Sequence, residues 1–170
     1  MEQELPELLR HRATETRAIN WGEISAELGT ELPADFKALS EAYPPLTIDE
    51  FLAILIPTPG AERFFISGVR RLLDMLRHRR DRGASRGYVP YPEEHGLLPW
   101  GSSSEGDIFY WKTSDGGPDS WTILVSGRND DWCEFQGSLT EYLAGLVSGA
   151  VPPDGLPPDF PGRTPTIESD

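Results

Sequence analysis

The sequence predicts an α+β protein in which helices come first, an antiparallel sheet follows and a last helix closes the domain. Three observations support this class. Apolar residues recur at helical spacing in the first half of the 170-residue chain, the second half has short aromatic and β-branched stretches between turn residues, and residues 138–149 return to helical spacing after a Ser138–Glu141 capping box. We expect about four to six antiparallel strands, flanked by the N-terminal helices, one long arginine-rich helix and the C-terminal helix.

Capping signals and prolines define the helices of the N-terminal half. Apolar residues at positions 5, 8, 9 and 13 predict a first helix. A second begins at Asn20, because Glu23 three residues later completes a pattern similar to a capping box, and it ends at Gly29. A third has Pro33 at its first helical position and ends before Pro44-Pro45.

The clearest helix is predicted from Glu62 to about Arg82. Its apolar residues form a single stripe that we expect to face the core: Phe65, Val69, Leu72, Leu73 and Leu76. Eight of the fifteen lysines and arginines lie between positions 63 and 86. A basic helix of this kind can bind a membrane or RNA, but in an acidic protein we expect its arginines to meet the protein's own carboxylates or water.

Aromatic and β-branched content predicts three strands, at residues 107–112, 121–125 and 132–135. Residues 47–56 fit two interpretations. Thr47 and Glu50 match a capping box, which favours a helix, whereas the short apolar run ending at Pro57 is typical of a buried strand. We favour the strand.

The strand segment Ile108–Trp111 is apolar or aromatic on both of its alternating faces. Such a strand is either covered on both faces or presents one face to a partner. We expect helices of the N-terminal half to provide the cover. An exposed tryptophan rimmed by acidic residues would instead be an interface anchor.

The last twenty residues contain six prolines, which exclude a helix or a central strand. We therefore predict one domain over residues 1–150 and an extended, proline-rich tail over residues 151–170. Leu156 and Phe160 are the residues expected to attach this tail to the domain.

The charge balance excludes several classes of function. Twenty-eight acidic residues against fifteen basic ones give a net charge of −13, whereas nucleic-acid binding needs a clustered excess of cations. No stretch is long and apolar enough to cross a bilayer, and the acidic N-terminus lacks the pattern of a secretory signal. Cys133, the one cysteine, permits no internal disulfide and no cysteine-based zinc cluster. A cytoplasmic protein that binds neither nucleic acid nor membrane is expected.

No motif predicts catalysis or a cofactor. Residues 101–106 have the glycine spacing of a phosphate-binding loop, but Asp107 and Ile108 stand where that loop needs lysine and then serine or threonine. We expect a flexible loop there. Cys133 is interpreted as a small buried hydrophobe, and no nucleophile pattern accompanies the three histidines: His11, His78 and His95.

The acidic loops of the C-terminal half offer oxygen ligands that suit Ca²⁺. Their carboxylates are Asp115, Asp119, Asp130, Asp131 and Glu134. Because they lack the spacing of an EF-hand, we expect solvated turns and no metal site.

A set of aromatic, glycine and Leu-Pro positions runs in order from about Asn20 to Gly149. Its members are Trp21, Gly29, Leu32-Pro33, Phe36, Leu39, Tyr43, Leu98-Pro-Trp-Gly101, Gly106-Asp107, Trp111, Trp121, Trp132 and Phe135. This order resembles the SUKH superfamily, which includes fungal cell-wall-assembly regulators and many bacterial immunity proteins. The resemblance implies an α+β domain that binds other proteins, many members neutralising a cognate toxin in the producing cell. It implies no catalytic residues.

We therefore expect a non-enzymatic immunity protein that binds a cationic toxin domain, for instance a nuclease. Residues 87–170 contain fourteen acidic residues and three cations, a charge that would speed the capture of a basic partner. The expected contact residues are an acidic rim and two candidate anchors: Glu105, Asp107, Asp115, Asp119, Asp130, Asp131 and Glu134, with Trp111 or Trp121. A regulatory scaffold without a toxin and a metal-dependent hydrolase built on the acidic loops remain alternatives.

Overall fold

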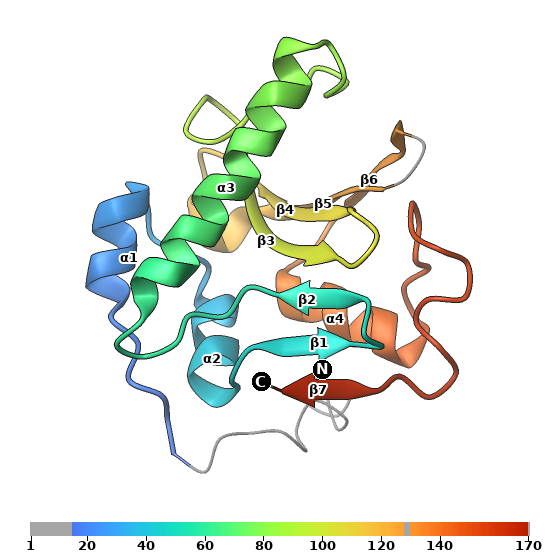
Figure 1. Ribbon diagram of the computed structural model, residues 1–170, viewed down its shortest axis with the longest axis horizontal. Coiled ribbons are helices and arrows are strands. Elements are labelled where there is room, and N and C mark those ends of the chain that lie inside the picture. The colour runs from blue at the N-terminus through green and yellow to red at the C-terminus, as the bar shows by residue number, and fades with distance from the viewer. Residues whose placement is uncertain (1–14, 128–129, 170) are drawn as a thin grey trace.

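The computed structural model describes residues 15–127 and 130–169. Within them, four α-helices and a seven-stranded antiparallel sheet make up the fold (Figure 1). The predicted α+β class is confirmed, with more strands than the four to six expected. The helix predicted over residues 5–13 lies outside the described residues.

The helices are α1 (Trp21–Leu28), α2 (Ala34–Ala42), α3 (Glu62–Asp81) and α4 (Leu139–Ser148), with a short 3-10 helix, η2 (Pro118–Ser120). The strands are β1 (Leu46–Ile48), β2 (Leu52–Ile54), β3 (Leu97–Ser103), β4 (Ile108–Lys112), β5 (Thr122–Ser126), β6 (Trp132–Phe135) and β7 (Ile167–Ser169). Their order in the sheet is β6-β5-β4-β3-β2-β1-β7. Strands that follow one another in sequence are therefore neighbours, and β7 alone is displaced, to the edge beside β1.

The predicted helix ends are confirmed where they rest on local hydrogen bonds. The Asn20 side chain accepts from the backbone N–H of Glu23 at the start of α1, and Gly29 ends that helix with φ 77°. At α4 both hydrogen bonds of the Ser138–Glu141 capping box are present. Helix α2 begins one residue later than expected, with Pro33 at the N-cap.

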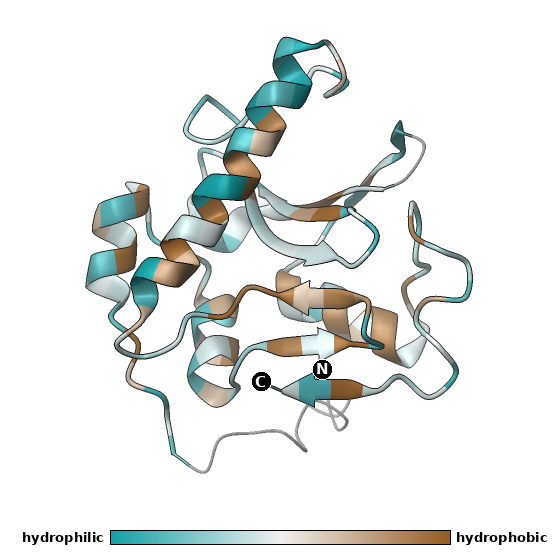
Figure 2. Ribbon diagram, viewed as in Figure 1, coloured by the Kyte–Doolittle hydropathy of each residue, from teal (hydrophilic) through white to brown (hydrophobic). Residues whose placement is uncertain are grey.

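Helix α3 carries the predicted apolar stripe, and all five of its residues are buried. Arginines off the stripe meet carboxylates, as expected: Arg70 pairs with Glu27 at 2.7 Å and Arg77 with Asp74 at 2.6 Å. Apolar and hydrophilic positions alternate along this helix in Figure 2. None of the helices in the described residues has the length and apolar character needed to cross a membrane.

A buried carboxylate joins the start of α3 to the start of α1. The Glu62 side chain is 4% exposed, and its Oε1 accepts from the backbone N–H of Asn20 at 2.9 Å. This hydrogen bond holds the pKa of Glu62 below its usual value of 4.5, although burial acts in the opposite direction. The ionised form is therefore favoured more strongly in the folded chain than in the unfolded chain.

The Glu62 hydrogen bond predicts a pH-dependent difference between the protein and its Glu62→Gln variant. A lowered folded-state pKa adds stability that is present above the unfolded pKa and is lost as pH falls through the folded pKa. We expect Glu62→Gln to lower the free energy of unfolding at pH 7, and we expect the gap to shrink steadily below about pH 4.5. Urea unfolding from pH 7 to pH 3 measures it, and a gap that stays constant over this range would contradict the assignment.

Residues 47–56 form neither the single strand that we favoured nor a helix, but the β1–β2 hairpin. Leu46 pairs with Ile54 and Ile48 with Leu52. Asp49 and Glu50 take the turn positions, both with φ 51°, and the Phe51 N–H donates to the Ile48 carbonyl at 3.0 Å. The Thr47–Glu50 capping box is therefore wrong, because these residues belong to a strand and a turn.

Strand β3 was not predicted, and residues 101–103 are part of it instead of a flexible loop. It contains Pro99 and Gly101, which are unfavourable in strands, and its pairing with β4 shifts register between them. The turn from β3 to β4 is closed by the Ser103 hydroxyl, which accepts from the backbone N–H groups of Glu105 and Asp107.

The proline-rich tail packs against the sheet. Phe160 is buried, as expected, with its ring centroid 4.5 Å from that of Phe51, and Leu156 is partly buried against the core. Asp49 holds the tail by accepting from the backbone N–H groups of Gly162 and Thr166. β7 then pairs with β1 at the edge of the sheet, where proline-rich sequence is tolerated.

Helices cover both faces of the central strands. Phe109 and Trp111 of β4 join a core that includes Phe36 of α2 and Tyr142 of α4. On the opposite face, residues of β4 and β5 pack against α3 in a second cluster that includes Leu72, Leu76, Tyr110 and Leu124. Figure 1 shows α3 on one side of β3 and β4, with α2 and α4 behind the sheet. Helices α2 and α3 of the N-terminal half cover the aromatic strand, as predicted, and the C-terminal helix α4 provides part of the cover that was not predicted.

Candidate functional site

Three of the nine expected contact residues are buried. Trp111 is 1% exposed and Trp121 is 7% exposed, because Trp111 packs against Phe36 of α2 at a ring separation of 5.0 Å and against Trp121 at 6.2 Å. Both side chains are part of the core, so the expectation that one of them anchors a partner is wrong.

Asp107 is 1% exposed and belongs to the β3–β4 turn. Its Oδ2 accepts from the Ser103 hydroxyl at 2.5 Å, and the same hydroxyl accepts from the Asp107 backbone N–H at 3.0 Å. This carboxylate therefore stabilises a turn from inside the protein, and its assignment to an exposed acidic rim is wrong.

The other six expected residues are exposed or partly exposed, but they do not lie together. In the β4–β5 pair Ile108 is opposite Ser126 and Lys112 is opposite Thr122. Antiparallel pairing therefore places Glu105, Asp130 and Asp131 at one end of these strands, whereas Asp115 and Asp119 lie at the other end. Glu134 lies between the two ends, on β6.

Basic side chains of the protein itself neutralise part of this charge. Asp130 accepts from Arg86 at 2.8 Å, and this hydrogen bond holds the pKa of Asp130 below its usual value of 3.8. Burial acts to raise the pKa of Glu134, but hydrogen bonds from Gln136 and Lys112 bring it below its usual value. These two carboxylates therefore have internal cationic partners and are less available to another molecule.

One grouping of exposed carboxylates lies where β4 ends, beside the loop that precedes β3. It consists of Glu93, Glu94, Asp115 and Asp119, and we call this surface the acidic end. Glu93 pairs with Arg80. Glu94 makes no hydrogen bond or ion pair with other described residues.

A cavity of about 260 Å³ opens at the acidic end. Three of the four carboxylates line it, together with His95, Tyr91 and Trp121. The Tyr91 hydroxyl donates to the Leu28 carbonyl at 2.7 Å, which fixes one wall of the cavity to α1. The cavity therefore combines an acidic rim with a wall of aromatic side chains.

A second cavity, of about 250 Å³, shares Trp121 with the first. Its acidic residues are Asp35 and Asp119, and both are engaged with helix ends: Asp119 accepts from the Ala34 N–H at 2.8 Å, and Asp35 from the Thr140 N–H at 3.0 Å. Both carboxylates therefore complete the N-termini of α2 and α4.

Hydrogen bonds between two loops hold the first cavity in shape. The Gly96 carbonyl accepts from the Thr113 backbone N–H at 3.1 Å and from its hydroxyl at 2.7 Å. The Gly96 N–H donates to the Glu93 carbonyl at 2.8 Å, which tightens the loop before β3. These bonds fix residues 93–95 next to the segment that carries Asp115.

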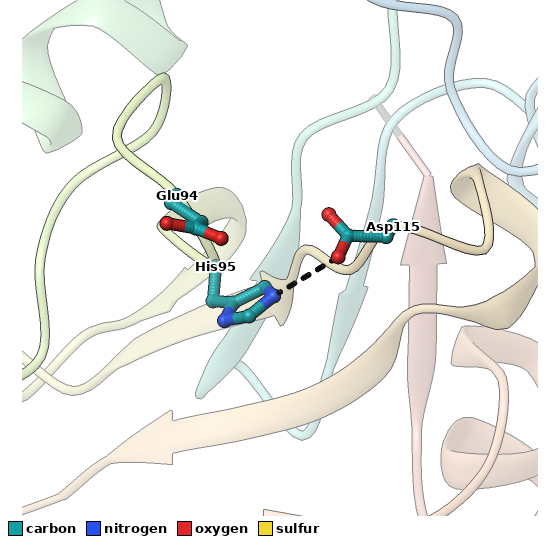
Figure 3. Close-up of side chains that lie close together, drawn as sticks. All are labelled: Glu94, His95 and Asp115. Carbon is teal, nitrogen blue, oxygen red and sulfur yellow. Dashed lines mark ion pairs between the residues drawn. The ribbon is translucent and has the colours of Figure 1, made fainter.

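Three side chains with metal-binding atoms meet at this point. Figure 3 shows Glu94 and His95 approaching Asp115 from the neighbouring loop. His95 Nε2 lies 3.7 Å from Asp115 Oδ2, and one ligand atom from each of the three residues lies within 4.8 Å of the others. His95 has a φ of 56°, which is uncommon for a residue with a side chain.

The sequence interpretation assigned no role to Glu93 and Glu94 and rejected His95 as a catalytic base. Sequence reasoning missed this site because it did not predict strand β3. Because Leu97 pairs with Lys112, a residue just before β3 must lie beside a residue just after β4, which brings His95 close to Asp115. Of the five carboxylates considered for a metal, Asp115 alone belongs to the cluster of three described above.

Comparison with protein-family models, with curated proteins and with solved structures finds no match for this chain. The resemblance to the SUKH superfamily therefore stays a prediction from the sequence.

Proposed function

We propose that this chain is a non-enzymatic immunity protein, which binds a cationic toxin domain through its acidic end. The proposal places it in the cytoplasm of the cell that makes the toxin. The observation that carries the proposal is the gathering of Glu94 and Asp115 around one cavity. Among the described residues neither is paired with a lysine or arginine, whereas Glu93, which also lines the cavity, pairs with Arg80, and Asp119 accepts from the start of α2. A cluster of exposed carboxylates attracts lysine and arginine side chains of a partner.

The net negative charge of the chain also favours binding of a basic partner. Residues 87–170 contain fourteen acidic residues and three cations, so the field around this half of the protein attracts a basic partner over a distance of roughly 10 Å at 0.1 M salt. The aromatic anchors that we first expected are in the core. Charge is therefore the main source of affinity in this proposal, and binding should be fast and strongly salt-dependent.

The double variant Glu94→Gln/Asp115→Asn tests the proposal against a matched control. Glu50→Gln/Asp159→Asn also removes two exposed negative charges, but from the β1–β2 turn and the tail. The partner to be tested is any basic domain that a gene next to that of this chain encodes. We expect the first variant to lower the association rate constant about tenfold in 50 mM salt and the control by less than twofold.

Growth protection completes this test. Co-expression of the chain with the basic domain should restore growth, and the Glu94→Gln/Asp115→Asn variant should protect less well than the control. Equal effects of the two double variants, or an association rate that does not change between 50 and 500 mM salt, would contradict binding at the acidic end. A basic partner that binds there but is not toxic would favour the regulatory scaffold.

A further inference from the structure

We propose that Glu94, His95 and Asp115 form a binding site for one divalent transition-metal ion of the Zn²⁺ type. The three residues come from two different loops, and one ligand atom of each lies within 4.8 Å of the others. The site shares Glu94 and Asp115 with the acidic end, so a bound ion would compete with a basic partner there. The inference itself is tested on the chain alone.

The donor atoms determine the class of ion. One imidazole nitrogen with two carboxylate oxygens suits Zn²⁺ and its first-row neighbours, whereas Mg²⁺ and Ca²⁺ prefer oxygen ligands throughout. Two carboxylates also balance the charge of a divalent cation. A site with three protein ligands leaves a coordination position for water, and the cavity of about 260 Å³ has room for it.

The distances between the ligand atoms can be compared with those that a bound ion requires. Two atoms that each lie ~2.1 Å from one ion can be at most ~4.2 Å apart. The His95 Nε2–Asp115 Oδ2 separation of 3.7 Å already satisfies this limit. A ligand atom of Glu94 lies within 4.8 Å of those of His95 and Asp115, and since all three side chains are exposed, rotation of the Glu94 side chain can close the distance that remains.

The backbone of the site is fixed before any ion binds. Thr113 makes two hydrogen bonds to the Gly96 carbonyl, and these join the residue after His95 to the segment that carries Asp115. His95 itself holds a left-handed backbone conformation with φ 56°, and its ring lies toward Asp115 (Figure 3). Binding therefore orders few groups beyond the three side chains, which lowers its entropic cost.

Calorimetric titration of the full chain with ZnCl₂ tests this proposal, with His95→Ala and Asp115→Asn as the disrupting variants. The matched controls are His78→Ala, an exposed histidine on α3, and Asp159→Asn, an exposed carboxylate in the tail. We expect one equivalent of Zn²⁺ to bind, each disrupting variant to weaken the Kd at least tenfold, and the controls to bind as the wild type does.

A second measurement identifies the ligand directly. In an NMR titration with Zn²⁺ the imidazole signals of His95 should shift or broaden, whereas those of His78 should not, and equal concentrations of Ca²⁺ or Mg²⁺ should leave both unchanged. The proposal is overturned if no heat is observed with Zn²⁺, if the disrupting variants and the controls bind equally well, or if the His95 signals do not respond.

Discussion

Trp111→Ala should lower the free energy of unfolding by about 3–5 kcal/mol, the range seen when a large aromatic side chain is removed from a core. Trp111 is 1% exposed and packs edge-on against Phe36 of α2 and beside Trp121. Its removal leaves a cavity between the sheet and α2 that the neighbouring rings cannot fill. Equilibrium urea unfolding followed by circular dichroism measures the loss.

Trp111→Phe is the matched control for this prediction. The Trp111 indole N–H has no hydrogen-bond partner among the described residues, so phenylalanine keeps most of the apolar contact and removes an unpaired buried donor. We expect it to cost clearly less than Trp111→Ala, because it removes fewer buried atoms and leaves a smaller cavity. If Trp111→Ala unfolded at the wild-type urea concentration and only weakened a partner's binding, Trp111 would be the surface anchor that the sequence first suggested.

The burial of Trp111 shows which part of the structure the sequence could not determine. The alternation in Ile108–Trp111 correctly indicated a strand with two apolar faces, and helices were the expected cover. An alternation pattern does not say which side chains are covered completely. That depends on where α2 and α4 dock, and their docking involves contacts between residues far apart in sequence.

The helices were predicted well because their signals are local. Asn20 and Ser138 cap the N–H groups of residues three positions away, so the sequence contains the whole interaction. The β1–β2 hairpin was missed because Glu50 stands in the turn where glycine is usual, so that Asp49-Glu50 lacks the Asp-Gly pattern of a two-residue hairpin turn. Asp49 bonds to Gly162 and Thr166 of the tail, and such long-range partners cannot be recognised from the turn sequence itself.

The candidate site, like the hairpin, depends on contacts between residues far apart in sequence. Asp115 was named from the sequence, but its position beside His95 depends on the pairing of β3 with β4, and β3 contains residues that disfavour a strand. Because Leu97 pairs with Lys112, the loop before β3 and the loop after β4 must lie side by side. The sequence alone suggested Asp115 as a candidate ligand. Only the register of the sheet shows that His95 lies beside it.

Gly96→Ala should destabilise the protein and disrupt the loop that carries Glu94 and His95. A Cβ atom at this position would lie 2.6 Å from the Tyr91 nitrogen and 2.7 Å from the Glu93 carbonyl oxygen. Both atoms belong to the backbone, so no side-chain rotation relieves the contact, and the loop must open. We expect a loss of about 3 kcal/mol, at the upper end of the usual cost of overpacking, in urea unfolding.

Opening this loop should also break the two hydrogen bonds from Thr113 to the Gly96 carbonyl and separate His95 from Asp115. Gly68→Ala is the control, because Gly68 lies in α3 with no atom within 4 Å of the added methyl group, and alanine there should stabilise the helix by up to ~1 kcal/mol. Gly96→Ala should therefore weaken Zn²⁺ binding while Gly68→Ala leaves it unchanged. A stable Gly96→Ala protein that binds Zn²⁺ as tightly as the wild type would mean that the two loops are not held together at Gly96, and that the three ligands do not depend on this contact.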